Sequence, residues 1–255
     1  MIFKVLSCRS IFISCKDECS SSSIKKEMSL FADFLALFFP HVCVACSEGL
    51  AAGEEILCSK CLMDLPRAKY AERTDNPILE KFAGRLPLTH AAALLIFRKK
   101  GIAQKLLHQL KYKGNQEAGL QMGRILGKEI REAGWKTDVI IPVPLHKHRL
   151  RQRGYNQSAV FAQGLSEEMG VPFLEDIIVR KKFTETQTKK NKISRWENVK
   201  NVFAAEQAGL LKNKHVLLAD DVVTTGATLE ACGLCIMQSG CSALSIACIA
   251  DAHGG

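Results

Sequence analysis

The chain has 255 residues, of which 47% are apolar, and it carries a formal net charge of +9 at pH 7. The apolar share supports a packed core, and the length fits one large domain or a domain of common size with appendages. The positive charge indicates a polyanionic ligand or partner. The 11 cysteines are too many to be incidental. A disulfide-bonded secreted protein would need an oxidising compartment, whereas paired cysteines in the reducing cytosol more often hold a metal.

The first 27 residues fit poorly with the rest of the chain. They contain a polar run from Ser20 to Ser23 and show no clear periodicity. Lys4 and Arg9 interrupt any apolar segment, so a signal peptide is not convincing. We interpret residues 1–27 as an extension that is disordered or not native, with Met28 as the natural start.

Residues 30–39 are strongly apolar, with large side chains at helical spacing. The segment is too short to span a bilayer and contains Asp33. We expect a short amphipathic helix that packs on the body of the protein, with a membrane-surface anchor as the alternative. No other segment qualifies as transmembrane.

Two Cys-x2-Cys pairs follow, separated by eleven residues: Cys43 with Cys46, and Cys58 with Cys61. Four thiolates at tetrahedral geometry suit a structural Zn2+ ion and leave no open position for catalysis. The segment is too short for a core of its own, so metal binding would supply much of its folding free energy. The sequence therefore predicts a unit at residues 28–66 that combines the short helix with a zinc knuckle. An iron–sulfur cluster or redox-active disulfides are the alternatives.

A third Cys-x2-Cys pair, Cys232 with Cys235, lies inside a predicted helix and has no second pair nearby. We interpret these two cysteines, together with Cys241 and Cys248, as small buried apolar residues.

The remainder of the chain alternates strand and helix patterns after a polar linker at residues 67–87. Strands are expected at 91–97 and 139–143, and helices at 102–112, at about 116–133 and at about 155–169. This alternation predicts an α/β domain at residues 88–255, with a parallel sheet flanked by helices. Ligands of such sheets bind beyond the carboxyl ends of the strands.

A short apolar run ends in Asp220 and Asp221, and a turn of small residues then leads into a helix near Leu229. A strand, a tight loop and a helix N-terminus form an anion site, to which threonine hydroxyls add donors. Carboxylates suit sugar hydroxyls or hydrated Mg2+ instead. The segment therefore predicts a ribose 5-phosphate site, with an ordinary strand–turn–helix as the alternative. The predicted phosphate-binding residues are Thr224, Thr225, Gly226, Ala227 and Thr228.

A strongly basic segment follows the strand at 139–143 and should face this turn across the sheet edge. It either binds pyrophosphate or is a solvated basic loop. Its candidate residues are His146, Lys147, Arg151, Arg153, Asn156 and Gln157. Residues 180–199 form a long polar stretch that fits a closing lid, and Gln187 and Arg195 are its candidate site residues.

The order of these motifs resembles the ComF family, and the resemblance covers nearly everything from Leu30 onward. It is carried by the cysteine knuckle, residues 110–114, Pro142 to Leu145, the run Arg151 to Gln157, Thr186-Gln187, Arg195, Asn198, Phe203, and Asp220 to Thr228.

The resemblance implies a type I phosphoribosyltransferase fold and a cytoplasmic role in natural transformation, in the uptake and processing of single-stranded DNA. It also implies that Asp220 and Asp221 bind the ribose 2- and 3-hydroxyls of phosphoribosyl pyrophosphate with Mg2+, and that residues 224–228 bind its 5-phosphate. Single-stranded DNA and a competence helicase are the candidate partners. The alternative is an active phosphoribosyltransferase that transfers ribose 5-phosphate to a nucleobase or an amine. No side chain stands out as a general base, so the sequence leaves both functions open.

Overall fold

The computed structural model describes residues 41–180 and 202–252. The extension at 1–27, the expected helix at 30–39 and the lid residues Gln187 and Arg195 therefore lie outside the described residues. Residues from Val42 onward belong to one compact unit. None of the helices in the described part of the chain has the length and hydropathy needed to cross a membrane.

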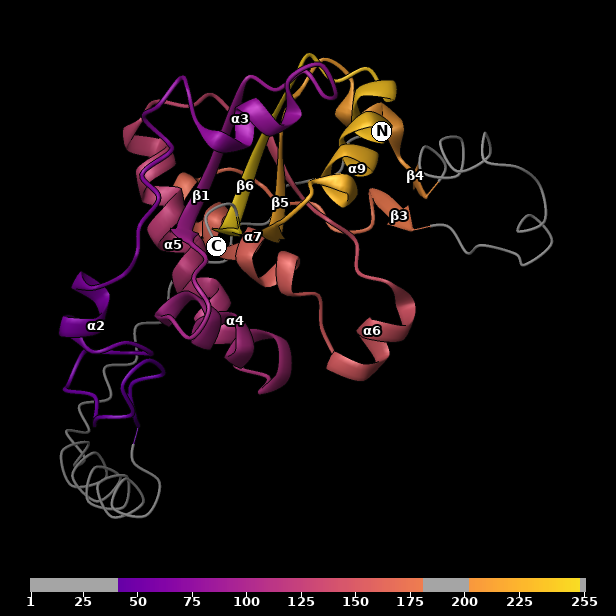
Figure 1. Ribbon diagram of the computed structural model, residues 1–255. Coiled ribbons are helices and arrows are strands. Elements are labelled where there is room, and N and C mark those ends of the chain that lie inside the picture. Colours follow the sequence, from indigo (N-terminus) through magenta and orange to yellow (C-terminus); the bar gives the residue numbers. More distant parts are fainter. Residues whose placement is uncertain (1–40, 181–201, 253–255) are drawn as a thin grey trace, which may run out of the picture. The chain divides into compact units, whose positions relative to one another are not determined.

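The centre of this unit is a sheet of four parallel strands in the order β1-β6-β5-β2 (Figure 1). The strands are β1 (His90–Ile96), β2 (Val139–Pro142), β5 (His215–Val223) and β6 (Ala243–Asp251). β5 and β6 are central, and most of their residues are buried, as expected for strands covered on both faces. The predicted parallel sheet is confirmed.

Four longer helices flank the sheet: α4 (Ile102–Tyr112), α5 (Gln116–Glu132), α7 (Gln157–Met169) and α9 (Ala227–Gln238). Figure 1 shows α9 on the other side of the sheet from α5, as expected when the connections between parallel strands are right-handed. Asn115 and Asn156 cap α5 and α7 by accepting bonds from the amides of Ala118 and Ser158. A small antiparallel ribbon joins β3 (Ile178–Arg180) to β4 (Phe203–Ala205), and a 3-10 turn, η2 (Ala208–Leu211), follows.

The expected linker at 67–87 is more than a spacer. It contains α3 (Pro77–Phe82), whose Ile78 and Phe82 are fully buried in the core. The Asn76-Pro77 pair is the helix start: the Asn76 side chain accepts from the amides of Ile78 and Leu79 and donates to the carbonyl of Ala91. The boundaries at 66/67 and 87/88 stay predictions.

The knuckle packs against the domain within the same unit. It includes the short helix α2 (Ser59–Met63) and is bonded to α5, where Glu55 accepts from Gln121 at 3.0 Å and lies 3.9 Å from the Arg124 guanidinium. Arg124 also contacts Glu117 at 3.3 Å and Glu167 of α7 at 2.9 Å. One exposed arginine thus links three elements, although each such surface pair contributes at most about 1 kcal/mol.

The tightest contact between helices is the crossing of α5 and α7. A Cβ atom added to Gly164 would lie 2.2 Å from the carbonyl oxygen of Leu120, and one added to Gly123 would lie 2.4 Å from that of Phe161. Both obstacles are backbone atoms, which cannot rotate away. Glycine is therefore required where these helices touch.

We predict that Gly164→Ala lowers the free energy of unfolding by about 3 kcal/mol, because the methyl group forces the two helix backbones apart. Gly209→Ala is the matched control, since a Cβ there meets nothing within 4 Å. Chemical denaturation of the zinc-loaded proteins measures both. Equal stability of the two variants would contradict the close crossing.

Candidate functional site

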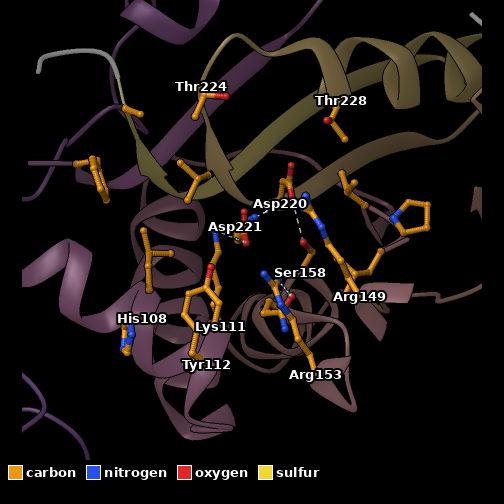
Figure 2. A pocket seen from close by; sticks show the side chains of 18 of the residues that line it. His108, Lys111, Tyr112, Arg149, Arg153, Ser158, Asp220, Asp221, Thr224 and Thr228 are labelled. Atoms are coloured by element: carbon orange, nitrogen blue, oxygen red, sulfur yellow. Dashed lines mark hydrogen bonds and ion pairs between the residues drawn. The ribbon is translucent and has the colours of Figure 1, made fainter. Parts of the chain in front are cut away.

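A cleft of about 460 Å³ lies beyond the carboxyl ends of the strands, between them and α4, α6 (Lys147–Arg153) and α7 (Figure 2). It is the place where a parallel sheet is expected to bind its ligand. The charged side chains that line it are those of Lys111, Arg149, Arg153, Arg180, Asp220 and Asp221.

Asp220 and Asp221 reach the cleft from β5, which continues past them to Val223. One Asp220 oxygen accepts from the Ser158 hydroxyl at 2.9 Å and from the Asp221 amide at 2.8 Å. The Lys111 ammonium lies 2.9 Å from an oxygen of Asp221. Each acid therefore has a different partner, Asp220 a neutral hydroxyl on α7 and Asp221 a cation on α4.

The two carboxylates repel each other at the centre of the cleft. Burial, and next the negative charge of Asp221, raise the pKa of Asp220 to about 7. A cation bound between the two acids would favour the ionised form of both. The pair is therefore suited to a divalent ion or to the hydroxyls of a sugar.

The predicted phosphate turn joins β5 to α9. Thr224 and Thr228 line the cleft, and Thr225, Gly226 and Ala227 form the turn between them. Gly226 has a φ of 78°, in the left-handed region that favours glycine. The helix N-terminus and two hydroxyls thus face the same space as the carboxylates (Figure 2).

The basic segment differs from the expected loop, because residues 147–153 form the helix α6. Its residues are good helix formers, and the first glycine, Gly154, is the left-handed C-cap. Residues four apart share a helix face, so Arg149 and Arg153 line the cleft while Lys147 and Arg151 do not.

The other candidate residues of this segment have local partners. His146 caps α6 with its own ring nitrogen. Asn156 caps α7, donates to the carbonyl of Val143 at 3.0 Å and lies outside the cleft. Gln157 lines the cleft and accepts from the Arg153 guanidinium at 2.7 Å.

Among the residues that the fold brings into the cleft, sequence reasoning did not assign Lys111, Arg149, Ser158 or Arg180. Burial, and next the charge of Arg149, lower the pKa of Arg180, and both cations line the cleft. Helical spacing could have paired Arg149 with Arg153, and Ser158 directly follows Gln157. Nothing local identifies Lys111 as the partner of Asp221.

An exposed aromatic ring stands at the edge of the cleft. Tyr112 is 66% exposed, its ring centroid lies 5.1 Å from that of His108, and the Arg153 guanidinium lies 5.6 Å from it (Figure 2). An open ring with a guanidinium beside it is suited to stacking on a planar ligand. Tyr155, by contrast, donates its hydroxyl to the carbonyl of Leu110 and is half-buried.

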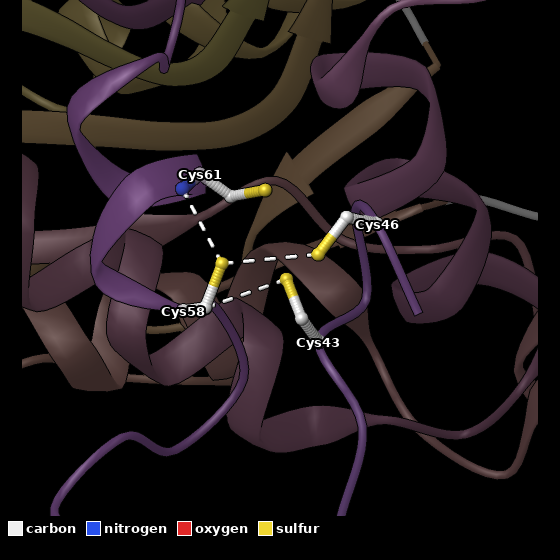
Figure 3. A group of neighbouring side chains, drawn as sticks. All are labelled: Cys43, Cys46, Cys58 and Cys61. Atoms are coloured by element: carbon white, nitrogen blue, oxygen red, sulfur yellow. Dashed lines mark hydrogen bonds between the residues drawn. The ribbon is translucent and has the colours of Figure 1, made fainter. Parts of the chain in front are cut away.

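The four knuckle cysteines converge on one point (Figure 3). Their sulfur atoms all lie within 4.8 Å of one another, and those of Cys46 and Cys58 are 3.8 Å apart. Tetrahedral Zn2+ with Zn–S bonds of about 2.3 Å requires sulfurs about 3.8 Å apart. The cluster could therefore hold a metal ion such as zinc.

The amides around the cluster favour thiolates. Burial opposes ionisation of Cys43, but the amides of Cys58, Cys46 and Ala45 outweigh it and lower its pKa to about 6. Burial and the neighbouring thiols raise the pKa of Cys61. Four sulfurs this close cannot all be ionised without a cation among them. As predicted, Cys232, Cys235, Cys241 and Cys248 are buried.

A family model for the phosphoribosyl transferase domain matches residues 108–255, more than half of the chain. The chain belongs to the phosphoribosyl transferase domain family. The match includes β2, β5, β6, both acids of the cleft and the phosphate turn.

Two relatives align with most of this chain. The DNA utilization protein YhgH of Escherichia coli (strain K12) is 28% identical over 84% of this chain and 98% of its own length. Competence protein F of Haemophilus influenzae is 28% identical over 76% of this chain and 89% of its own length. The chain is a homologue of both, which confirms the resemblance to the ComF family. Among solved structures, the allosteric regulatory enzyme of purine biosynthesis aligns with a TM-score of 0.40 and 18% identity, over 52% of this chain and 26% of that one.

We predict that the purified protein binds about one zinc ion per chain and that Cys58→Ser abolishes this binding, because three sulfurs cannot close the tetrahedron. Cys235→Ala is the matched control, since it alters a cysteine of the same spacing outside the cluster. Metal analysis and thermal unfolding measure both variants. Full zinc content in Cys58→Ser would exclude the cluster as the site.

Proposed function

We propose that this chain binds phosphoribosyl pyrophosphate together with Mg2+ and assists the uptake and processing of single-stranded DNA during competence. The observation that supports this ligand is that the Asp220–Asp221 pair, Thr224 and Thr228 line the same cleft as the basic side chains of α6. The turn offers hydrogen-bond donors for the 5-phosphate, and the two acids suit the ribose hydroxyls. The basic side chains of α6 suit the pyrophosphate.

In this proposal Asp220 and Asp221 hold the ribose hydroxyls, either directly or through Mg2+, and the turn at 224–228 holds the 5-phosphate. The pyrophosphate lies toward Arg149 and Arg153, the basic side chains of α6 that line the cleft. Binding of the metal-bearing ligand would displace the Lys111 ammonium from Asp221, where it balances the negative charge. The knuckle holds a structural Zn2+ ion that stabilises its short chain.

The DNA part of the proposal is supported by the names of the relatives and by the exposed ring of Tyr112. This ring stands between His108 and Arg153, so a base could stack on it while the basic side chains of α6 contact the phosphates. A cytoplasmic location and the docking of a competence helicase belong to the same proposal and follow from the family resemblance alone.

A second candidate function is transfer of ribose 5-phosphate to a nucleobase or an amine. The Gln104 amide and the His108 imidazole line the same cleft, and both could hydrogen-bond an acceptor. Pyrophosphate release that depends on a specific acceptor would favour this enzyme. Binding without turnover, together with salt-dependent affinity for single strands, would favour the accessory role.

We predict that phosphoribosyl pyrophosphate with Mg2+ binds the wild type with micromolar affinity and that Asp220→Asn/Asp221→Asn weakens it at least a hundredfold, by removing both acids without changing their shape. Calorimetric titration of zinc-loaded protein measures this. Asp75→Asn is the matched control, because the side chain of Asp75 is 84% exposed and lies outside the cleft. Binding that survives in the double variant would refute the site.

We also predict that Tyr112→Ala lowers the affinity for a single-stranded oligonucleotide about tenfold, since stacking on one base contributes about 1–3 kcal/mol. Fluorescence anisotropy at two salt concentrations measures it, with Leu210→Ala as a control at another exposed apolar side chain. Unchanged affinity in Tyr112→Ala would place the DNA on another surface.

A further inference from the structure

Two cations hold the back of the phosphate turn. The Lys81 ammonium, from α3, donates to the carbonyl of Thr224, and the Arg85 guanidinium, just beyond α3, donates to the carbonyl of Thr225 at 3.4 Å. These are the carbonyls of consecutive residues in the turn proposed to bind the 5-phosphate. Both cations come from residues 67–87, which precede the region that the family model matches.

The two cations are themselves anchored. The Lys81 side chain is 7% exposed, and its ammonium lies 3.9 Å from a carboxylate oxygen of Asp251, whose side chain is 1% exposed at the end of β6. Arg85 forms an ion pair with Glu230 in the first turn of α9. Their positions are therefore set by the sheet and by the helix that follows the turn, and they do not depend on the turn alone.

The aromatic ring of Phe82 lies against Gly226, the third residue of the turn. A Cβ atom on Gly226 would lie 2.7 Å from an edge carbon of Phe82, so the turn lies directly against α3. Phe82 is fully buried, and the Asn76 cap bonds the start of α3 to β1. The turn thus packs against α3, and α3 is hydrogen-bonded through Asn76 to the edge strand β1.

This arrangement decides where the amides of the turn point. In a trans peptide the C=O and the following N–H are antiparallel, and the described residues contain no cis peptide bond. Because the carbonyls of Thr224 and Thr225 point to α3, the N–H groups of Thr225 and Gly226 point away from it. Within the residues that the structure describes, neither N–H donates to a protein acceptor.

We propose that Lys81 and Arg85 are positioning residues that hold the turn with two free amides directed at an anionic phosphate. Anion binding by successive backbone N–H groups requires this orientation. The inference rests on the proposed 5-phosphate site, and it means that α3 and the residues that follow it position the turn of that site.

The experiment separates the two ends of the ligand. Calorimetry with ribose 5-phosphate probes the turn, and calorimetry with magnesium pyrophosphate probes the cationic face of α6. We expect Lys81→Met and Arg85→Gln each to weaken ribose 5-phosphate about tenfold while pyrophosphate affinity stays within twofold. Lys128→Met and Arg131→Gln, on the exposed side of α5, are the matched controls and should change neither affinity.

Three results would overturn the positioning role of Lys81 and Arg85 or the 5-phosphate site on which it rests. Wild-type affinity for ribose 5-phosphate in both variants would show that the cations do not position the turn. Equal loss of both ligands would reveal general damage to the fold and no specific role. If the wild type does not bind ribose 5-phosphate, the proposed site itself fails. Thermal unfolding checks each variant. If the buried Lys81→Met does not fold, Arg85→Gln decides, since the Arg85 side chain is 38% exposed.

Discussion

The negative charge of two adjacent carboxylates near the carboxyl end of β5 is the constraint on which the site depends. Asp220 is buried, and its pKa is raised toward neutrality by that burial and by Asp221. Such a pair is costly unless donors or cations surround it. Ser158 and Lys111 supply these from α7 and α4, and the remaining charged side chains of the cleft are arginines. The cleft is thus an acidic centre within a basic rim.

The partners of these acids reach them because the helices pack closely. The glycine contact between α5 and α7 allows backbone to touch backbone, and α7 carries Ser158 to Asp220. On the other side of the turn, α3 occupies the position where Gly226 has no side chain. Small residues are therefore placed where the distance between two elements decides the geometry of the site.

The knuckle follows a different principle. Its segment is short, and four converging sulfurs add order to it once a metal is bound. Ile56, Leu57 and Leu65 of the same segment are buried in the common hydrophobic core. Its bonds to Gln121 and Arg124 join it to α5, one of the helices that cover the sheet. The same α5 thus packs against α7 and bonds the knuckle, and the knuckle is joined to the body of the protein both by these polar contacts and by its buried apolar side chains.

Local patterns in the sequence determined the parallel α/β sheet, the helix at 102–112 with both of its ends, the four-cysteine cluster and the acid–turn–helix motif, because each depends on spacing within a short segment. Only the tertiary structure decided which basic side chains face the cleft, since the helical form of α6 selects Arg149 and Arg153. It also decided that Lys111 pairs with Asp221, and that residues from 67–87 pack against the turn proposed to bind phosphate. These contacts join residues 110 to 143 positions apart in the chain. Their formation depends on how the helices pack on the sheet, which no local pattern specifies.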